Sequence, residues 1–159
     1  MRLNENGEGF IERILRLTGA SEWIGRSGLF VYDTLIAYNV AGVLVPITVA
    51  ETPSFLREAE AALTENERNE LVSYLAANPE AGDIMPETGG ARKLRWKAKR
   101  RGKSGGARAI YYYHNDSLPL FLLNVFAKNE RANLSKAERN EMRKLLPRLI
   151  AGYRKRTTR

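Results

Sequence analysis

The sequence predicts an α+β fold whose elements follow the order β-α-α-β-β-β-α over residues 47–150. Two helix-start signals come in close succession after a short β-branched run. Three strand-type runs follow with short loops between them, and a third helix-start signal precedes the last amphipathic run. Since short loops join antiparallel strands, we expect an antiparallel sheet with an N-terminal helical hairpin and a C-terminal helix.

The first predicted elements are a short strand and two acidic helices. Residues 47–50 form a β-branched run, and Thr52-Pro53 supplies an N-cap followed by proline at the first helical position. This helix is expected to run to about Leu63. The residues from Thr64 to Glu67 form a capping box that begins the second helix, which Asn78-Pro79 ends.

The second half of the chain is predicted to form the rest of the sheet, followed by one helix. Strands are expected over 93–97, 108–113 and 118–127, between loops at 79–90 and 98–106. Charged and apolar residues alternate in the first strand, which predicts one solvated face, whereas the nearly all-apolar third predicts burial on both faces. The capping box from Ser135 to Glu138 begins the last helix, which Pro147 is expected to kink or end. Residues 151–159 are expected to form a basic tail.

Residues 1–46 are unlike the rest of the chain. Apolar residues at helical spacing over 10–17 predict a short amphipathic helix. The mostly apolar stretch 28–50 is about long enough to cross a bilayer, but polar residues and a proline interrupt it and no Lys cluster flanks it. The interpretation we favour is an N-terminal extension, translated from a start codon placed too early, before a domain over 47–150.

Composition excludes several classes of site. The 159 residues are 43% hydrophobic and 28% charged, which is typical of a soluble globular chain. There is no Cys, which excludes disulfides, Cys-based zinc or iron–sulfur sites and thiol nucleophiles. The single His, His114, excludes multi-His metal sites. We therefore expect no metal or cofactor, and the reduced cytosol is the natural compartment.

The charge is distributed very unevenly along the chain. Residues 47–90 carry 2 basic and 9 acidic side chains, whereas residues 91–159 carry 20 basic and 4 acidic ones. Such a gradient predicts one face made for a polyanion, most plausibly nucleic acid or the ribosome. The alternative is an ordinary solvated basic surface.

The strongest local signal is the segment 91–113, which holds nine basic residues and no acidic one. Lys93, Arg95 and Lys97 should point to the same side of their strand, and the apolar residues between them to the other. Like charges in a row repel each other. A bound phosphate backbone would offset this repulsion, because arginine grips phosphate with a two-pronged donor geometry.

The neighbouring loop and strand supply further candidates for RNA binding. Between the glycines of the loop stand four basic residues, Lys99, Arg100, Arg101 and Lys103. This is not a P-loop, because Lys97 occupies the position of the required first glycine. The glycines either let backbone N–H groups wrap a phosphate or only give the hairpin flexibility. Tyr112 could stack on a base or belong to the core, and His114, at a predicted turn, is either solvated or a proton-transfer group.

Three runs of residues, in this order, carry a family resemblance. They are TGGARKLRW (88–96), RGKSGGARAIYY (101–112) and FAKNE (126–130), the last followed by Leu134-Ser135. Over about residues 47–146 the chain resembles the HigB-type branch of the RelE/ParE toxin superfamily. The resemblance implies the order of elements given above. It also implies a cytoplasmic bacterial type II toxin, an mRNA interferase that inhibits translation by cleaving mRNA, usually in the ribosomal A site.

The resemblance also assigns roles to the basic residues. Lys93 and Arg95 match the paired basic positions on the strand after the helical hairpin, and Arg108 matches the arginine that begins the next strand. Lys93 is the candidate general base, since neighbouring cations favour a neutral lysine, whereas arginine stays protonated. Arg95 and Arg108 would hold the phosphate.

Two positions depart from the RelE pattern. Asn129 stands where an arginine is expected, and Leu134 lies near the position of a catalytic tyrosine. Lys128 keeps a positive charge beside the first gap, so we include it among the catalytic candidates. A tyrosine from residues 111–113 could replace the missing one, which leaves the general acid unassigned.

The resemblance implies partners and leaves two alternatives. The partners are the ribosome with its mRNA and a cognate antitoxin, expected to be a helix-turn-helix DNA-binding protein that covers the basic face. Operator DNA would be reached only through that antitoxin, and no membrane is expected. One alternative is a ParE-like gyrase poison, with the same fold and no nuclease activity. A weaker one is a membrane-tethered basic domain that uses residues 28–50.

Overall fold

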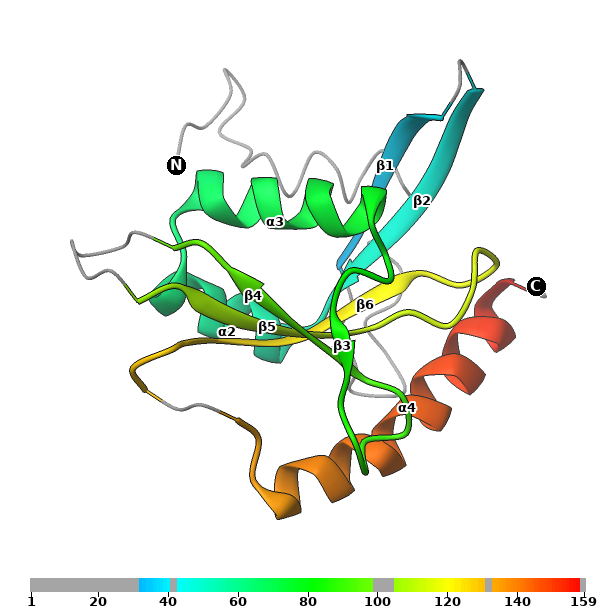
Figure 1. Cartoon of the computed structure of the whole chain (residues 1–159). Coiled ribbons are helices and arrows are strands. Elements are labelled where there is room, and N and C mark those ends of the chain that lie inside the picture. The colour runs from blue at the N-terminus through cyan, green and yellow to red at the C-terminus, as the bar shows by residue number, and fades with distance from the viewer. Residues whose placement is uncertain (1–31, 41–42, 99–104, 131–132, 158–159) are drawn as a thin grey trace, which may run out of the picture.

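A computed structural model describes residues 32–40, 43–98, 105–130 and 133–157. They form a mixed α+β fold, in which one sheet has helices on both faces (Figure 1). The strands are β1 (Tyr32–Val40), β2 (Val43–Glu51), β3 (Asp83–Ile84), β4 (Arg92–Trp96), β5 (Ala107–Tyr112) and β6 (Leu120–Ala127). The helices are α2 (Pro53–Ala62), α3 (Glu65–Ala77) and α4 (Lys136–Thr157). The strand order is β1-β2-β6-β5-β4-β3.

The predicted helix starts are confirmed by their hydrogen bonds. The Thr52 hydroxyl accepts from the backbone N–H of Phe55 at 3.3 Å, and proline follows as the first residue of α2. The capping box from Thr64 to Glu67 makes both of its reciprocal bonds at the start of α3. In the box from Ser135 to Glu138, before α4, each residue's backbone N–H donates to the other's side chain, at 2.7 and 3.2 Å.

The last helix is longer than predicted. Instead of ending near Pro147, α4 continues to Thr157 and takes up most of the expected basic tail. Pro147 lies on the exposed side of the helix, while Leu146 and Leu149 are buried on either side of it. A proline costs a helix one backbone hydrogen bond. Burial of the leucines offsets that cost, and so the helix passes through the proline.

The prediction of a wholly antiparallel sheet is wrong. The register pairs Val49 with Leu120 and Glu51 with Leu122 in the parallel direction, so β2 runs parallel to β6 at the centre of the sheet. This follows from the long connection between the two strands, which contains two helices and three strands and allows the chain to return in the same direction.

Two further strands were not predicted at all. β1 pairs with β2 along nine residues, and the two-residue β3 pairs with β4 inside the expected loop 79–90. Within the stretch 28–50, the described residues are therefore mostly strand. No described helix is long and apolar enough to span a bilayer. The helix predicted over 10–17 lies outside the described residues, and the domain boundary at 47 stays a prediction.

Two hydrophobic cores lie on opposite faces of the sheet. The core under α2 and α3 contains Phe55, Leu71 and Tyr111. The core under α4 contains Ile110 and Phe126, together with the buried apolar residues of α4 itself. The central strands β5 and β6 contribute to both cores, as expected for strands buried on both faces.

Candidate nucleic-acid interface

Four basic side chains lie at one end of the sheet on the face that carries α4. Arg95 of β4 is directly opposite Arg108 of β5, which in turn is opposite Phe126 of β6. Paired residues on neighbouring strands point to the same side, and Phe126 belongs to the core under α4, so both arginines lie on that face. We call Lys93, Arg95, Arg108 and Lys128 the cationic cluster.

The register also places the two lysines of the cationic cluster. Lys93 is opposite Ile110, another residue of the core under α4. Lys128 follows the last residue of β6 by one position, and its backbone N–H donates to Gly106 at 3.1 Å, which extends the β5–β6 ladder. Lys128 is two residues beyond Phe126, so the alternation of side chains along a strand places Lys128 on the same face as Phe126. The register thus places all four predicted catalytic candidates on the same face of the sheet.

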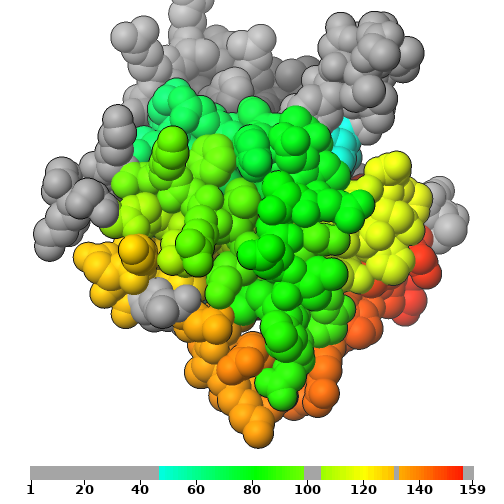
Figure 2. Space-filling model, in the orientation of Figure 1, coloured from blue at the N-terminus to red at the C-terminus, as the bar shows by residue number. Residues whose placement is uncertain are grey.

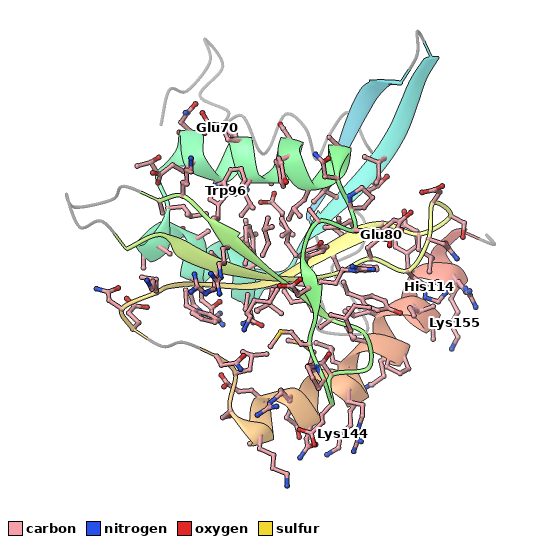
Figure 3. The ribbon with its side chains drawn as sticks, in the orientation of Figure 1. Glu70, Glu80, Trp96, His114, Lys144 and Lys155 are labelled. Atoms are coloured by element: carbon pink, nitrogen blue, oxygen red, sulfur yellow. The ribbon has the colours of Figure 1, made fainter. Side chains whose placement is uncertain are left out.

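Strand β4 is held in this orientation by its apolar side chains. Leu94 and Trp96 pack against the core under α2 and α3. The indole N–H of Trp96 donates to the Glu67 carbonyl at 3.3 Å, and its ring lies 5.4 Å from that of Tyr74. Figure 3 shows Trp96 between β4 and α3. With these residues fixed on one face, the alternation of the strand directs Lys93 and Arg95 to the other.

No described carboxylate forms an ion pair with the cationic cluster, although Asp83 is opposite Lys93 in the β3–β4 register. No hydrogen bond or ion pair joins any of its four side chains to a described residue, whereas other arginines of the chain are paired. Arg92 lies 3.1 Å from a Glu80 oxygen. Two like charges directly opposite each other on neighbouring strands destabilise a sheet. A polyanion on this face would relieve that repulsion.

The remaining residues predicted to bind RNA have different outcomes. Lys97 is exposed next to β4. The loop residues Lys99, Arg100, Arg101 and Lys103 lie outside the described residues. Tyr112 is buried in the core under α4 and only 7% exposed, so its ring has little free surface on which a base could stack.

No described hydrogen bond joins any of the three consecutive tyrosines to the cationic cluster. Tyr111 is on the opposite face, where its hydroxyl accepts from the Gly82 N–H at 2.8 Å, and burial raises its pKa. Tyr112 is four residues along β5 from Arg108, or about 13 Å at the usual rise of a strand. Burial raises the pKa of Tyr112 as well. The general acid therefore stays unassigned.

The hydroxyls of the last two tyrosines have local partners. The Tyr112 hydroxyl lies 3.0 Å from Nδ1 of His114. Tyr113 donates to the Asp116 carboxylate, which together with burial raises the pKa of Tyr113 to about 12. His114 is exposed two residues after the end of β5, and no hydrogen bond within the described part of the chain connects it to the cationic cluster.

An open pocket of about 150 Å³ borders the cationic cluster at Lys93. Its lining comes from β3 and the residues after it, from β4, and from the first turn of α4 and the loop before it: Asp83, Ile84, Met85, Pro86, Lys93, Asn133 and Arg139. Figure 2 shows the segment around β3, in green, against the first turns of α4, in orange. Sequence reasoning missed Asp83, Asn133 and Arg139, because only the pairing of β3 and the docking of α4 bring them to Lys93.

The loop between β3 and β4 fixes one wall of this pocket. Thr88 is fully buried, and its hydroxyl donates to the Met85 carbonyl at 2.8 Å and accepts from the Ala91 N–H at 3.0 Å. Gly90 has a backbone φ of 109°, which residues with a side chain rarely adopt, and a Cβ there would lie 3.3 Å from the Tyr112 ring.

Among the described residues, no three His, Asp or Glu side chains gather as metal ligands would.

The family model of the RelE toxin of the RelE/RelB toxin–antitoxin system matches residues 51–157. This match covers most of the chain and every element from the end of β2 to the end of α4. The chain belongs to the RelE toxin family. The RelE match contains the whole cationic cluster and the pocket beside it, and it begins at the last residue of β2, so β1 precedes it.

Proposed function

We propose that this RelE-family chain is a HigB-type toxin that inhibits translation by cleaving mRNA on the ribosome. The observation that carries the proposal is the position of Lys93, Arg95 and Arg108 on one face of neighbouring strands, where no described carboxylate forms an ion pair with them. Like charges on neighbouring strands make the sheet less stable, and these residues lie within the RelE family match. Their arrangement therefore calls for a functional explanation. An RNA phosphate at the cationic cluster supplies one.

The proposed reaction is an attack of a ribose 2′-oxygen on the neighbouring phosphorus. Lys93 takes the 2′-hydroxyl proton as general base. The new O–P bond gives a 2′,3′-cyclic phosphate, while the bond to the 5′-oxygen breaks and that oxygen leaves with the electron pair and takes up a proton from water. Arg95, Arg108 and Lys128 neutralise the negative charge that develops on the phosphate and on the leaving oxygen.

The mRNA on either side of the cleaved bond would follow the basic surface. Lys97 lies at the end of β4 next to the cationic cluster, and the loop residues 99–103 are expected to add phosphate contacts. Such contacts fix the register of a nucleic acid without reading its sequence. Affinity that depends on these residues should fall steeply as the salt concentration rises.

The proposed partners follow from the same charges. A cognate antitoxin that neutralises the toxin would have to place acidic side chains on the cationic cluster, and we propose a helix-turn-helix protein that alone contacts operator DNA. The ribosome supplies the mRNA, which places the action in the cytoplasm. The family match does not support the ParE-like gyrase poison, for which induction would trigger an SOS response while mRNA stays intact.

The test is induction of the full chain in bacterial cells, followed by mapping of mRNA 5′ ends. We expect new ends inside translated reading frames, and their loss when translation is blocked before induction. The control variant is Lys144→Ala, which removes an exposed lysine paired with Glu141 on α4 and should cut like the original chain. Growth arrest with intact mRNA would contradict the proposal.

A further inference from the structure

The two edges of the six-stranded sheet are built very differently. A free edge presents a row of backbone N–H and C=O groups with which another strand can pair, and proteins commonly block it with a very short strand, a lysine, a proline or a bulge. The β3 edge is only two residues long. The β1 edge has nine residues that pair with β2 in an unbroken register, and it contains no lysine, arginine or proline. Among the described strands, β1 is therefore the edge that is left open to pairing.

Strand β1 also belongs to a two-stranded arm that extends past the rest of the sheet (Figure 1). β6 pairs with β2 only over residues 49–51, so within the described part of the chain residues 35–40 and 43–48 have no ladder partners except each other. We call these two segments the arm. A two-stranded ribbon is at best marginally stable in water, and three or more strands with an apolar face are needed for independent stability. A further strand along β1 would complete the arm.

The charges of the chain favour a second copy of itself as the source of that strand. Two copies, each with a net charge of +8, repel each other when their basic surfaces meet. The stretch 34–50 contains no charged residue, so this repulsion is weak at the arm. In an antiparallel pairing of two β1 strands centred at Ile36, Asp33 of each copy is opposite Asn39 of the other. No like charges are then directly opposite one another.

We propose that the chain forms a two-fold symmetric dimer, in which the β1 strands of two copies pair antiparallel and join their sheets into one. The interface is self-complementary, because each copy offers the same edge to the other. Since β2, β6 and β5 separate β1 from β4 in each sheet, the Arg95 residues of the two copies would lie roughly 40 Å apart at the usual strand spacing. At this distance salt screens the repulsion between the two cationic clusters, and both stay open to RNA. The dimer goes beyond the proposed function, since β1 precedes the residues of the RelE match.

The experiment measures the mass of the full chain in solution, so that neither RNA nor cleavage is needed. Sedimentation velocity is recorded at protein concentrations from about 1 to about 100 μM. We expect the mass to rise with concentration from the 17.9 kDa of one chain to twice this value. Such a rise, by itself, shows a dimer and not which surface forms it.

Charged substitutions at Ala37, next to the middle of β1, locate the interface. Ala37 is opposite Pro46, one position away from Ile47, which packs against the core under α2 and α3. The two copies of residue 37 would be neighbours in the dimer, so Ala37→Lys and Ala37→Glu should each raise the dissociation constant about tenfold or more. An equimolar mixture of the two variants should form dimers again, because lysine then lies beside glutamate. The matched control is Ala151→Lys, at an exposed alanine of α4, which should dimerise like the original chain. Circular dichroism verifies that each variant is folded.

A chain that stays monomeric at about 100 μM would overturn the proposal and leave the β1 edge to a strand from the antitoxin or from the first 31 residues of the same chain. Dimers that persist in both Ala37 variants would place the contact on another surface. A mixture of the two variants that stays monomeric would contradict direct pairing of two β1 strands. A dimer that never cuts mRNA would support this inference and contradict the proposed nuclease instead, so the two proposals can fail separately.

Discussion

On the α2–α3 side of the sheet, Arg68 donates to both carboxylate oxygens of Glu51, at 2.8 and 2.9 Å. On the α4 side, Arg95 and Arg108 face each other, and neither forms an ion pair with a described residue. Glu51 is only 3% exposed, and its hydrogen bond raises the pKa of Arg68. Arg68 therefore stabilises the fold, whereas the repulsion between Arg95 and Arg108 makes the sheet less stable.

The comparison separates charged side chains that stabilise the fold from those whose arrangement needs a functional explanation. A mostly buried bidentate pair satisfies both partners, and removing one of them leaves the other unpaired. An arrangement of like charges has no such benefit, so a sequence selected only for stability would not keep it. The two environments lie in one small fold, which allows the same kind of substitution to be compared on both sides.

The largest effect is expected from Arg108→Ala. Loss of one preorganised donor to the developing charge should reduce cleavage by roughly 10²- to 10³-fold, enough to abolish growth arrest. Because the substitution also removes the repulsion of Arg95, the melting temperature should stay the same or rise. Growth curves and thermal unfolding of the purified variant check both parts. A folded variant with undiminished toxicity would remove Arg108 from the site.

Arg68→Ala should have the opposite effects, lowering stability while cleavage stays similar. It leaves the buried Glu51 carboxylate unpaired, so we expect a loss of about 2–4 kcal/mol in the free energy of unfolding. Denaturant titration measures this loss. The control is Arg57→Ala, which removes only a 3.5 Å exposed bond to Ser54 and should cost less than about 0.5 kcal/mol. Equal destabilisation by the two variants would contradict the account of the Arg68–Glu51 pair.

Arg95→Gln should give a smaller effect, visible in the salt dependence of RNA binding. If Arg95 neutralises one phosphate, its loss should reduce the slope of log affinity against log salt by about 0.7 for a single strand. Fluorescence titrations at several salt concentrations measure the slope. The control, Arg92→Gln, removes an arginine bonded to Glu80 and to Gly82. An unchanged slope for Arg95→Gln would place the RNA elsewhere.

The smallest effect concerns Tyr113, far from the cationic cluster. The pKa of Tyr113 is raised to about 12, so its proton is held more tightly in the folded chain than in the unfolded one. Its contribution to stability is therefore complete below about pH 10 and is lost as the pH rises from 10 to 12. Asp116→Asn should move the pKa back toward 10, which phenolate absorbance measures. Activity between pH 6 and 9 should not change.

Local signals predicted the helices well and the sheet only in part. The caps at Thr52, Thr64 and Ser135 act within one helical turn, so each helix start could be read from a few residues. The parallel pairing of β2 with β6 and the strand β1 depend on contacts between distant segments. β3 contains two residues, too few to give a pattern. Pro147 was misjudged because burial of its neighbours outweighs the local penalty.

The candidate site shows the same division. Alternation along one strand predicted that Lys93 and Arg95 share a face, and the family resemblance added Arg108 and Lys128. That Arg95 lies directly opposite Arg108 is a matter of register, which no single strand encodes. The pocket draws Arg139 from a helix that begins about forty residues after β4, and such a meeting follows only from the fold.

The most direct test of the central claim is single-turnover cleavage of an mRNA on purified, programmed ribosomes. The assay compares the full chain with Arg108→Ala and Arg68→Ala, at a temperature where all three are folded. We expect the original chain and Arg68→Ala to cut at similar rates, Arg108→Ala to be slowed at least a hundredfold, and no cutting to occur without ribosomes. Cleavage by Arg108→Ala at the original rate, or intact mRNA with every protein, would contradict the central claim.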